Sequence, residues 1–409
     1  MGIMHRVTTN GMLHIYRANL QNSYKTLSTA MQKVQTGRNF LSYAEDPASA
    51  TLAFKLRREH WQANCQLRNN NSILSNFSQA FNSYDLVKNN LANQTVEVNA
   101  LRGLNDPNGT ARKTLAQSTY EAAESAVQTL NVQYGGRFLF AGADGMNAPF
   151  TIEEREVMQA DGTKLMKMDT TTDPPTPTDE PVLQKQLCYR GIPVNQPEKI
   201  VKLDAHGNQV TDPATGEPVM EPNPEYQKLK SMLEEATYVD IGLGMQENPD
   251  GTPIKSTVYN SALSGLEYLD FGYDEDGDPK NAISIMLGIH HHLDGASDMD
   301  GKWHKEDDGT YTNDSPSYER LFEMTKKLEV ARKKMDVEFT ELSTKASFLT
   351  NNGKRLETEI DELETQIVGV EDIDPVAAIT TLSWAQYCYN AGLKIGNSIL
   401  SQSLIDYMN

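Results

Sequence analysis

Three consecutive histidines are the side chains of this sequence best suited to metal chemistry. His290, His291 and His292 carry imidazole rings, which are common ligands of zinc. Consecutive residues of a helix point about 100° apart, so three neighbours share one ion poorly. We therefore expect a solvated or partly packed turn here, without a metal.

Acidic residues beside glycines are a second candidate, for calcium. Asp274, Asp276 and Asp278 surround a glycine, and Asp298 and Asp300 precede another. A calcium-binding EF-hand loop needs a glycine at its sixth position and a glutamate at its twelfth, and neither segment has that spacing. We expect both segments to be acidic turns.

No residue pattern indicates catalysis or a cofactor. The sequence has no nucleophile elbow, phosphate-binding loop, dinucleotide fingerprint or HExxH motif. Cys65, Cys188 and Cys388 are too far apart for a zinc motif or a disulfide framework, and helical periodicity places Cys65 and Cys388 on packed or partly packed faces. We predict a protein that is not an enzyme and that uses no cofactor.

The charge of the chain is acidic and unevenly distributed. The 409 residues carry 37 Lys and Arg against 56 Asp and Glu, a net charge of −19. Residues 143–317 hold 13 basic and 33 acidic residues, whereas residues 1–142 have a net charge of +6. Nucleic acid and anionic membranes both require basic surface, and no apolar run is long enough to span a bilayer. We expect neither nucleic-acid binding nor membrane insertion.

The elements that dominate the sequence are long helices. Apolar residues recur every seven positions over 318–370, which is the seam of a coiled-coil helix. At about 1.5 Å per residue this helix is roughly 75 Å long, and its narrow apolar stripe needs a partner of similar length. Residues 47–101 have the same repeat and are the best candidate partner. Residues 110–133 are predicted to form an alanine-rich helix.

Shorter helices are predicted at both ends of the chain. Residues 11–36 and 375–409 are amphipathic, and Asp46-Pro47 and Asp374-Pro375 are helix-start signals. We expect the two terminal helices to dock on each other or on a neighbouring copy. The apolar seam predicted for assembly consists of Leu13, Leu20, Leu27, Leu56, Phe77, Tyr84, Leu91, Leu328, Leu342, Leu349, Leu356, Leu363, Leu382, Leu393 and Leu400.

The predicted fold is mainly α with a β-containing insertion. Long helices from both ends form an antiparallel coiled-coil bundle, and the middle forms a β-rich outer domain. The expected domains are terminal core helices at 1–46 and 371–409, a helical rod at 47–147 and 318–370, and an acidic outer domain at 148–317. Residues 137–145 are expected to form a strand entering a turn. Within the middle, strands are expected in 185–203, 238–245 and 254–260, a loop at 169–181, and helices at 226–236 and 280–293.

Four stretches resemble the flagellin superfamily, and most closely its hook–filament junction members, the hook-associated protein 3 family. They are Arg6-Val-Thr-Thr-Asn10, Thr36-Gly-Arg38 with Glu45-Asp-Pro47, Tyr134–Gly142 closed by Pro149-Phe150, and Asp374-Pro-Val-Ala-Ala with the helix that follows it. The third stretch is similar to the junction members rather than to flagellin itself. Glu45-Asp46 stands where the family more commonly has two aspartates.

The resemblance implies a structural subunit that assembles into a helical ring or tube of identical copies, with the terminal helices inside and the middle domain outside. It implies hook-associated protein 1 and flagellin as neighbours, a cytoplasmic export chaperone, and the flagellar type III export apparatus. The expected location is the extracellular flagellum after a transient stay in the cytoplasm. Two alternatives stay open: a flagellin that forms the bulk filament, or a non-flagellar surface protein with a helical stalk.

Overall fold

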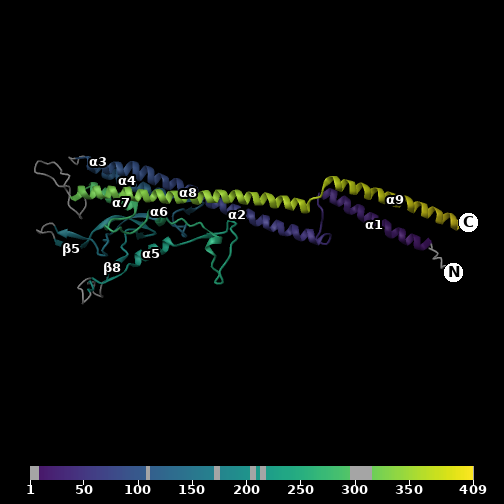
Figure 1. Cartoon of the computed structure of the whole chain (residues 1–409), viewed down its shortest axis with the longest axis horizontal. Helices are drawn as coiled ribbons and strands as arrows, with labels where there is room; N and C mark the ends of the chain where they lie inside the picture. The colour runs from purple at the N-terminus through teal and green to yellow at the C-terminus, as the bar shows by residue number, and fades with distance from the viewer. Residues whose placement is uncertain are drawn as a thin grey trace. The chain divides into compact units, whose positions relative to one another are not determined.

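A computed structural model describes residues 9–106, 111–169, 176–202, 209–211, 218–294 and 316–408. The chain divides into two compact units (Figure 1). Unit 1 consists of Met1–Leu67 and Lys354–Asn409, and unit 2 of Arg68–Gly353. The fold is mainly α with a β-containing insertion, so the predicted fold class is confirmed. In the part of the chain that is described, no helix is both long and apolar enough to cross a membrane.

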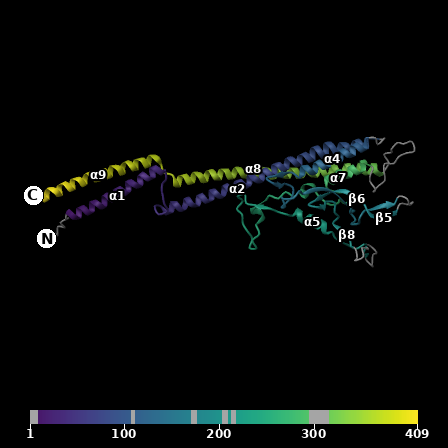
Figure 2. The ribbon, with the colours of Figure 1, turned by 180° about the vertical axis from the view of Figure 1, so that it is seen from behind.

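Unit 1 contains the two terminal helices, α1 (Thr9–Thr36) and α9 (Pro375–Met408). Figures 1 and 2 both show them side by side. The unit also contains the first part of α2 (Pro47–Asp85) and the last part of α8 (Pro316–Glu371). Those two parts pack through Leu56, Ala63 and Leu363, and the Arg57 guanidinium is paired with the Glu371 carboxylate. Helices α1, α8 and α9 match the predicted ranges to within a few residues, and α2 begins at the predicted residue.

The two connectors of unit 1 are joined by backbone hydrogen bonds. Gly37 ends α1 in the left-handed region, at φ +68°, a conformation that suits glycine. The Asn39 amide donates to the Glu371 carbonyl at 2.7 Å, and the Ile373 amide donates to the Gly37 carbonyl at 2.9 Å. The turn after α1 is therefore tied to the turn before α9.

Both predicted Asp-Pro helix starts occur in the structure. Asp46 accepts a hydrogen bond from the Ser49 amide at 3.1 Å, and Asp374 accepts one from the Val376 amide at 2.9 Å. These bonds satisfy amide donors that the first turn of a helix leaves without helical partners.

The helical part of unit 2 departs from the predicted continuous helix over 47–101. α2 ends at Asp85 and is followed by a π-helix, η1 (Leu86–Glu97), and by α3 (Val98–Leu104). In η1 the Thr95 hydroxyl donates to the carbonyl of Asn90, five residues back. The wider π turn brings Val87, Ala92 and Val96 onto the buried face, at a spacing that a heptad pattern does not predict.

The long helices of unit 2 run antiparallel. Asn70 lies against Leu349, Phe81 stacks on Phe339 with ring centroids 4.1 Å apart, and the Glu97 carboxylate is 2.6 Å from the Arg332 guanidinium. Residue numbers thus rise along α2 and η1 as they fall along α8. Residues 68–97 are therefore a partner of α8 within this unit, as the heptads predict.

Two further helices complete the helical layer. α4 (Arg112–Leu130) and α7 (Ala282–Asp294) pack on each other, and α7 lies on the carboxyl-terminal part of α3. A side chain at Gly103 would collide with Leu293, whose nearest atom is 2.2 Å from the position of an added Cβ. A larger residue at this position would therefore force the Leu293 side chain to shift.

The insertion consists of small antiparallel sheets. A three-stranded sheet has the order β3 (Phe150–Glu156), β6 (Leu183–Tyr189), β7 (Ile192–Pro193). The two-stranded sheets are β1 (Gln133–Tyr134) with β2 (Arg137–Phe138), β4 (Met166–Asp169) with β5 (Thr176–Pro181), β8 (Lys199–Val201) with β9 (Met220–Pro222), and β10 (Tyr238–Val239) with β11 (Tyr259–Asn260). The short helices are α5 (Pro224–Leu233), η2 (Lys255–Thr257) and α6 (Gly265–Leu269).

One of the local predictions for the insertion is wrong. Residues 176–181 form a strand where a loop was expected, because they pair with β4. The strand entering a turn that was expected over 137–145 is present as β2, which ends at Phe138, followed by turn residues that include Gly142 at φ +69°. Residues 170–175 lie outside the described residues.

Candidate assembly interface

The structure separates the predicted seam residues into two sets. Most of those on the long helices are buried within the chain, whereas Leu91 and those on the terminal helices are more accessible. Buried are Leu56, Phe77, Tyr84, Leu328, Leu342, Leu349, Leu356 and Leu363. Half-buried are Leu13, Leu20, Leu27, Leu91 and Leu382; Leu393 is exposed, and the side chain of Leu400 lies outside the described residues. Only the second set is placed where another molecule could contact it.

The pairing of α1 with α9 is antiparallel and depends on glycine. Tyr24 packs on Tyr389 with ring centroids 5.9 Å apart. Leu20 lies against Gly392, and Tyr16 lies so close to Gly396 that its hydroxyl oxygen is 1.9 Å from where a Cβ would be. Two small residues on α9 therefore receive two large side chains of α1.

The outer surface of α9 carries large apolar side chains that the seam prediction missed. Trp384 and Tyr387 are 64% and 67% exposed, and their rings meet edge to face at 5.8 Å. Ile379 is also exposed and lies with these two residues around one shallow depression. The spacing of residues 376, 379, 384, 387 and 395 could have indicated a second apolar stripe. The seam predicted for this helix contained only leucines.

The first part of α2 has a similar exposed stripe. Phe54 and Trp61, seven residues apart, are 72% and 66% exposed. Large aromatic side chains exposed to this degree on soluble proteins commonly mark interaction surfaces. Together with exposed Ile15 and Tyr24 on α1, they make unit 1 a candidate interface for association.

The terminal helices also carry little charge. Between Thr9 and Thr36 the charged residues are Arg17, Lys25 and Lys33, and between Pro375 and Met408 they are Lys394 and Asp406. Burying a charge against a neighbour is costly unless it is paired, so a surface of apolar and short polar groups is suited to lateral packing.

The histidines considered as metal ligands lie in a helix, and the expectation of a turn was wrong. His290 on α7 is hydrogen-bonded through Nδ1 to the Ala116 carbonyl at 2.9 Å. Burial lowers the pKa of His291 and of His292 to about 4, so both are neutral near pH 7. Among the described residues, no group of three or more His, Cys, Asp or Glu is placed to hold a metal ion.

The acidic segment at 274–278 is bound by basic side chains of α8. Lys327 Nζ lies 2.5 Å from carboxylate oxygens of Asp274 and Asp276, and Arg320 is paired with Asp278. The hydrogen bonds to Asp274 and Asp276 raise the pKa of Lys327. Cations from the chain itself thus occupy the positions a calcium ion would take. Asp298 and Asp300 lie outside the described residues.

Among the described residues, no disulfide joins the three cysteines. Cys188 is buried and Cys65 is half-buried, whereas Cys388 on α9 is exposed. Burial raises the pKa of the Cys188 thiol to about 11. That thiol is therefore protonated near neutral pH, which does not suit it to nucleophilic chemistry.

The segment from Tyr134 to Phe150 connects the helices of unit 2 to the insertion. Gly135 and Gly136, at φ +59° and +78°, form the two-residue turn between β1 and β2. Phe140 is buried, and its carbonyl accepts hydrogen bonds from the Tyr189 hydroxyl at 3.0 Å and the Gly265 amide at 2.9 Å. One residue of this segment thus holds both β6 and the start of α6.

The end of this segment is held by an ion-paired glutamate and by the side chain of Asn131, the residue that caps the end of α4. The Arg190 guanidinium lies 2.8 Å from Glu235, which in turn accepts from the Ala143 amide at 3.1 Å. The Asn131 side chain donates to the Phe150 carbonyl and accepts from the Phe150 amide, at 2.7 and 3.0 Å. These contacts give the segment a structural role at the base of the insertion.

Comparison with known proteins gives one family match. Residues 7–144, about a third of the chain, match the bacterial flagellin N-terminal helical region. The match covers α1 to α4 and ends within the Tyr134–Phe150 segment. No match was found among curated proteins.

Solved structures from several bacteria match most of the chain at low sequence identity. A putative flagellar hook-associated protein from Vibrio parahaemolyticus has 13% identity and a TM-score of 0.45, over 80% of this chain and 99% of that one. The flagellar hook-associated protein 3 of Legionella pneumophila has 14% identity and a TM-score of 0.40, over 77% and 98%. FlgL of Bacillus cereus has 12% identity and a TM-score of 0.37, over 77% and 99%.

The matched residues 7–144 include α1 and α2. These are the amino-terminal helices of the two antiparallel pairs, α1 with α9 and α2 with α8. The match agrees with a chain whose described residues offer buried seams and an exposed apolar face, and no group that could hold a metal. Residues 7–144 are thus similar to the helical region of bacterial flagellin, a flagellar structural protein.

Proposed function

We propose that this chain is the subunit of the hook–filament junction, forming the zone between hook-associated protein 1 and the flagellin filament. Copies would associate through unit 1 into a helical ring or tube, with α1 and α9 inside and the acidic insertion outside. The observation that carries the proposal is the exposed apolar face of unit 1, in a chain whose residues 7–144 match the flagellin helical region.

The distribution of charge supports this orientation. The terminal helices carry few charges, and residues 143–317 carry 33 acidic against 13 basic residues. A weakly charged surface loses little solvation when it is buried between copies, whereas an acidic domain is well solvated outside. The same argument favours unit 1 as the contact surface rather than unit 2.

Export also fits the exposed face of α9. We propose passage through the flagellar type III export apparatus, with a cytoplasmic chaperone covering the terminal helices beforehand. Trp384 and Tyr387 would otherwise be exposed at the protein concentrations of the cytoplasm, and exposed apolar patches promote unwanted association. A chaperone that binds α9 would cover both.

A second candidate function is flagellin, the subunit of the bulk filament. The matched family model is that of flagellin, which favours this alternative. The Tyr134–Phe150 segment favours the junction role, through the resemblance of its Gly-Arg-Phe-Leu-Phe-Ala-Gly sequence to junction proteins.

Immunogold electron microscopy of whole flagella separates the two. An antibody raised against residues 218–294 of the insertion should label one narrow band where the hook meets the filament. Labelling along the entire filament would support flagellin instead. Absence of label from flagella, with the protein detected elsewhere on the cell, would contradict both.

A further inference from the structure

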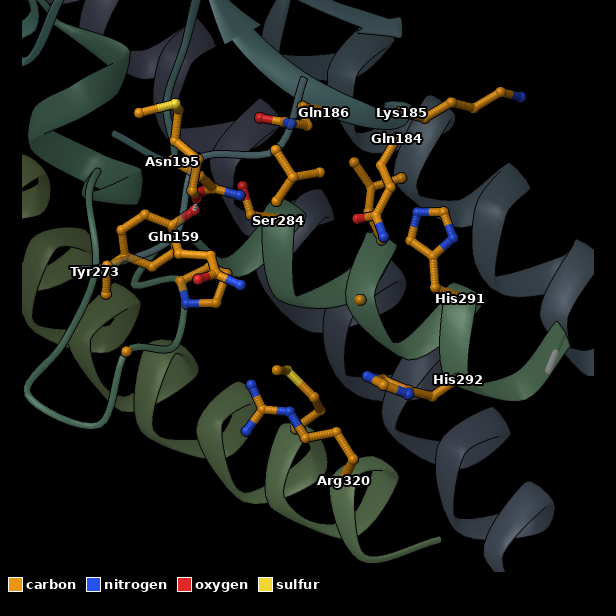
Figure 3. A pocket seen from close by; sticks show the side chains of 18 of the residues that line it. Gln159, Gln184, Lys185, Gln186, Asn195, Tyr273, Ser284, His291, His292 and Arg320 are labelled. Carbon is orange, nitrogen blue, oxygen red and sulfur yellow. Dashed lines mark hydrogen bonds between the residues drawn. The ribbon is translucent and has the colours of Figure 1, made fainter. Parts of the chain in front are cut away.

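Unit 2 contains a partly open cavity that the structural role does not use (Figure 3). Its volume is about 380 Å³, within the usual range for small-molecule sites. The segment after β3, strand β6, helix α7 and the start of α8 contribute its walls. These elements are far apart in the sequence, and all of them belong to the same unit.

Three polar atoms of the cavity wall are buried and have no hydrogen-bond partner among the described residues: Asn195 Oδ1, Ser284 Oγ and His291 Nε2. Ser284 is only 5% exposed. Figure 3 shows Ser284 and His291 on α7, where seven residues separate them and place them on one face of the helix. Buried polar atoms are normally hydrogen-bonded, so three such atoms at one cavity indicate a ligand that supplies the partners.

The three atoms are all electrically neutral. Burial lowers the pKa of His291 to about 4, so its imidazole is uncharged at neutral pH. An uncharged imidazole nitrogen and a hydroxyl can each donate or accept, according to the tautomer and rotamer, whereas an amide oxygen accepts only. A hydroxyl group of a ligand can both donate and accept a hydrogen bond, and can therefore pair with each of the three atoms.

The charged side chains of the wall are already engaged. Arg320 is paired with Asp278, Lys185 Nζ lies 4.1 Å from the ring centroid of Tyr120, and the Asp161 carboxylate accepts hydrogen bonds from the amide and hydroxyl of Thr163. A ligand with a net charge would have to displace one of these contacts. An uncharged ligand would displace neither.

Part of the wall is apolar. Leu287 and Met324 contribute aliphatic surface, and the Tyr273 ring is held in place by a hydrogen bond from its hydroxyl to the Met158 carbonyl. A fixed aromatic ring with neutral polar groups around the same cavity is a combination suited to sugars, because a pyranose ring has C–H faces and a rim of hydroxyls.

We propose that this cavity binds an uncharged, hydroxylated ligand the size of a monosaccharide, through Asn195, Ser284 and His291. The site is independent of the proposed assembly role. Ser284 and His291 hydrogen-bond to its hydroxyls, Asn195 accepts from a hydroxyl or amide hydrogen, and the apolar wall contacts its carbon skeleton.

Titration calorimetry of the full chain with N-acetylglucosamine tests the site, with cationic glucosamine and anionic glucuronate as charged comparisons. Saturable binding of N-acetylglucosamine alone is expected. The Ser284→Ala variant should bind about tenfold more weakly, because one hydrogen bond is lost. The Ser83→Ala variant removes a serine that is 7% exposed on α2 and does not line the cavity, and should bind as the unmodified chain does.

Two outcomes would overturn the proposal. One is no saturable binding of N-acetylglucosamine, or equal binding by the Ser284→Ala variant when circular dichroism shows that it is folded. The other is a high-resolution crystal structure, grown with the sugar, in which ordered water alone bonds to the three atoms.

Discussion

At the scale of single residues, Gly396 decides how closely the terminal helices approach. The Tyr16 hydroxyl oxygen lies 1.9 Å, and its Cζ 2.2 Å, from the position of a Cβ at residue 396, so any side chain there must displace a rigid aromatic ring. Gly369, in α8 of the same unit, has no atom within 4 Å of the equivalent position. These two helical glycines therefore form a matched pair for mutation.

The Gly396→Ala variant should weaken the pairing of α1 and α9 by about 1–3 kcal/mol, the usual cost of overpacking. The Gly369→Ala variant should stabilise its helix by about 0.5–1 kcal/mol, because alanine loses less backbone entropy than glycine. Amide hydrogen exchange in α1 measures the first effect, and thermal melting the second. Unchanged exchange in Gly396→Ala would contradict the close contact.

His291 and His292 make the stability of unit 2 depend on pH. Burial lowers both pKa values from 6.5 to about 4, so between these values the unfolded chain binds more protons than the folded chain. Stability is therefore fully present above pH 6.5 and is lost as the pH falls towards 4. Each histidine contributes about 1–3 kcal/mol to this loss.

Urea denaturation at pH 7 and at pH 4.5 measures the dependence. Other groups titrate in this range, so the informative quantity is the difference between the natural chain and the His291→Gln, His292→Gln double variant. The double variant should lose less stability between the two pH values. An equal loss would show that the two histidines are not buried as neutral groups.

At the scale of elements, the heptads of α8 correctly predict which face is buried. Leu349 is completely buried, whereas Val337 on the same helix is 65% exposed. The Leu349→Asp variant should lose about 3–5 kcal/mol, because an unpaired carboxylate enters the seam. The Val337→Asp variant should stay within about 0.5 kcal/mol. Melting midpoints by circular dichroism compare them, and equal midpoints would mean that Leu349 faces solvent.

The same elements show where a sequence pattern stops being informative. The repeat through Leu56, Phe77 and Tyr84 predicts the buried face of α2, because a helix has a fixed period. The repeat fails in η1, where the period changes and Val87, Ala92 and Val96 are buried while Leu91 is only half-buried. A local change in helix type depends on hydrogen bonds such as that of Thr95, which a hydrophobic pattern does not encode.

The candidate interface and the cavity were harder to predict, for different physical reasons. Trp384 and Tyr387 lie on an amphipathic helix, and the pattern alone does not tell which of two apolar stripes a helix partner covers. Asn195, Ser284 and His291 come together only through the packing of a loop against α7. Such contacts are non-local, and no spacing within the sequence identifies them.

At the scale of the whole molecule, the buried seams and the exposed stripes have separate roles. The seam residues Leu349 and Leu363 are used within the chain, so their loss affects folding. Trp384, Tyr387, Phe54 and Trp61 are exposed, so their loss should affect association while folding is retained. This separation makes the assembly proposal testable without destabilising the subunit.

The most direct test replaces the exposed pair on α9 and measures incorporation into flagella. Cells producing the Trp384→Glu, Tyr387→Glu variant should secrete it into the medium but leave it out of isolated flagella, because charge cannot be buried between copies. The Met146→Glu variant, changed at a residue that is 76% exposed in unit 2, should be incorporated normally. Incorporation of the α9 variant at the level of the natural chain would contradict the assembly role of unit 1.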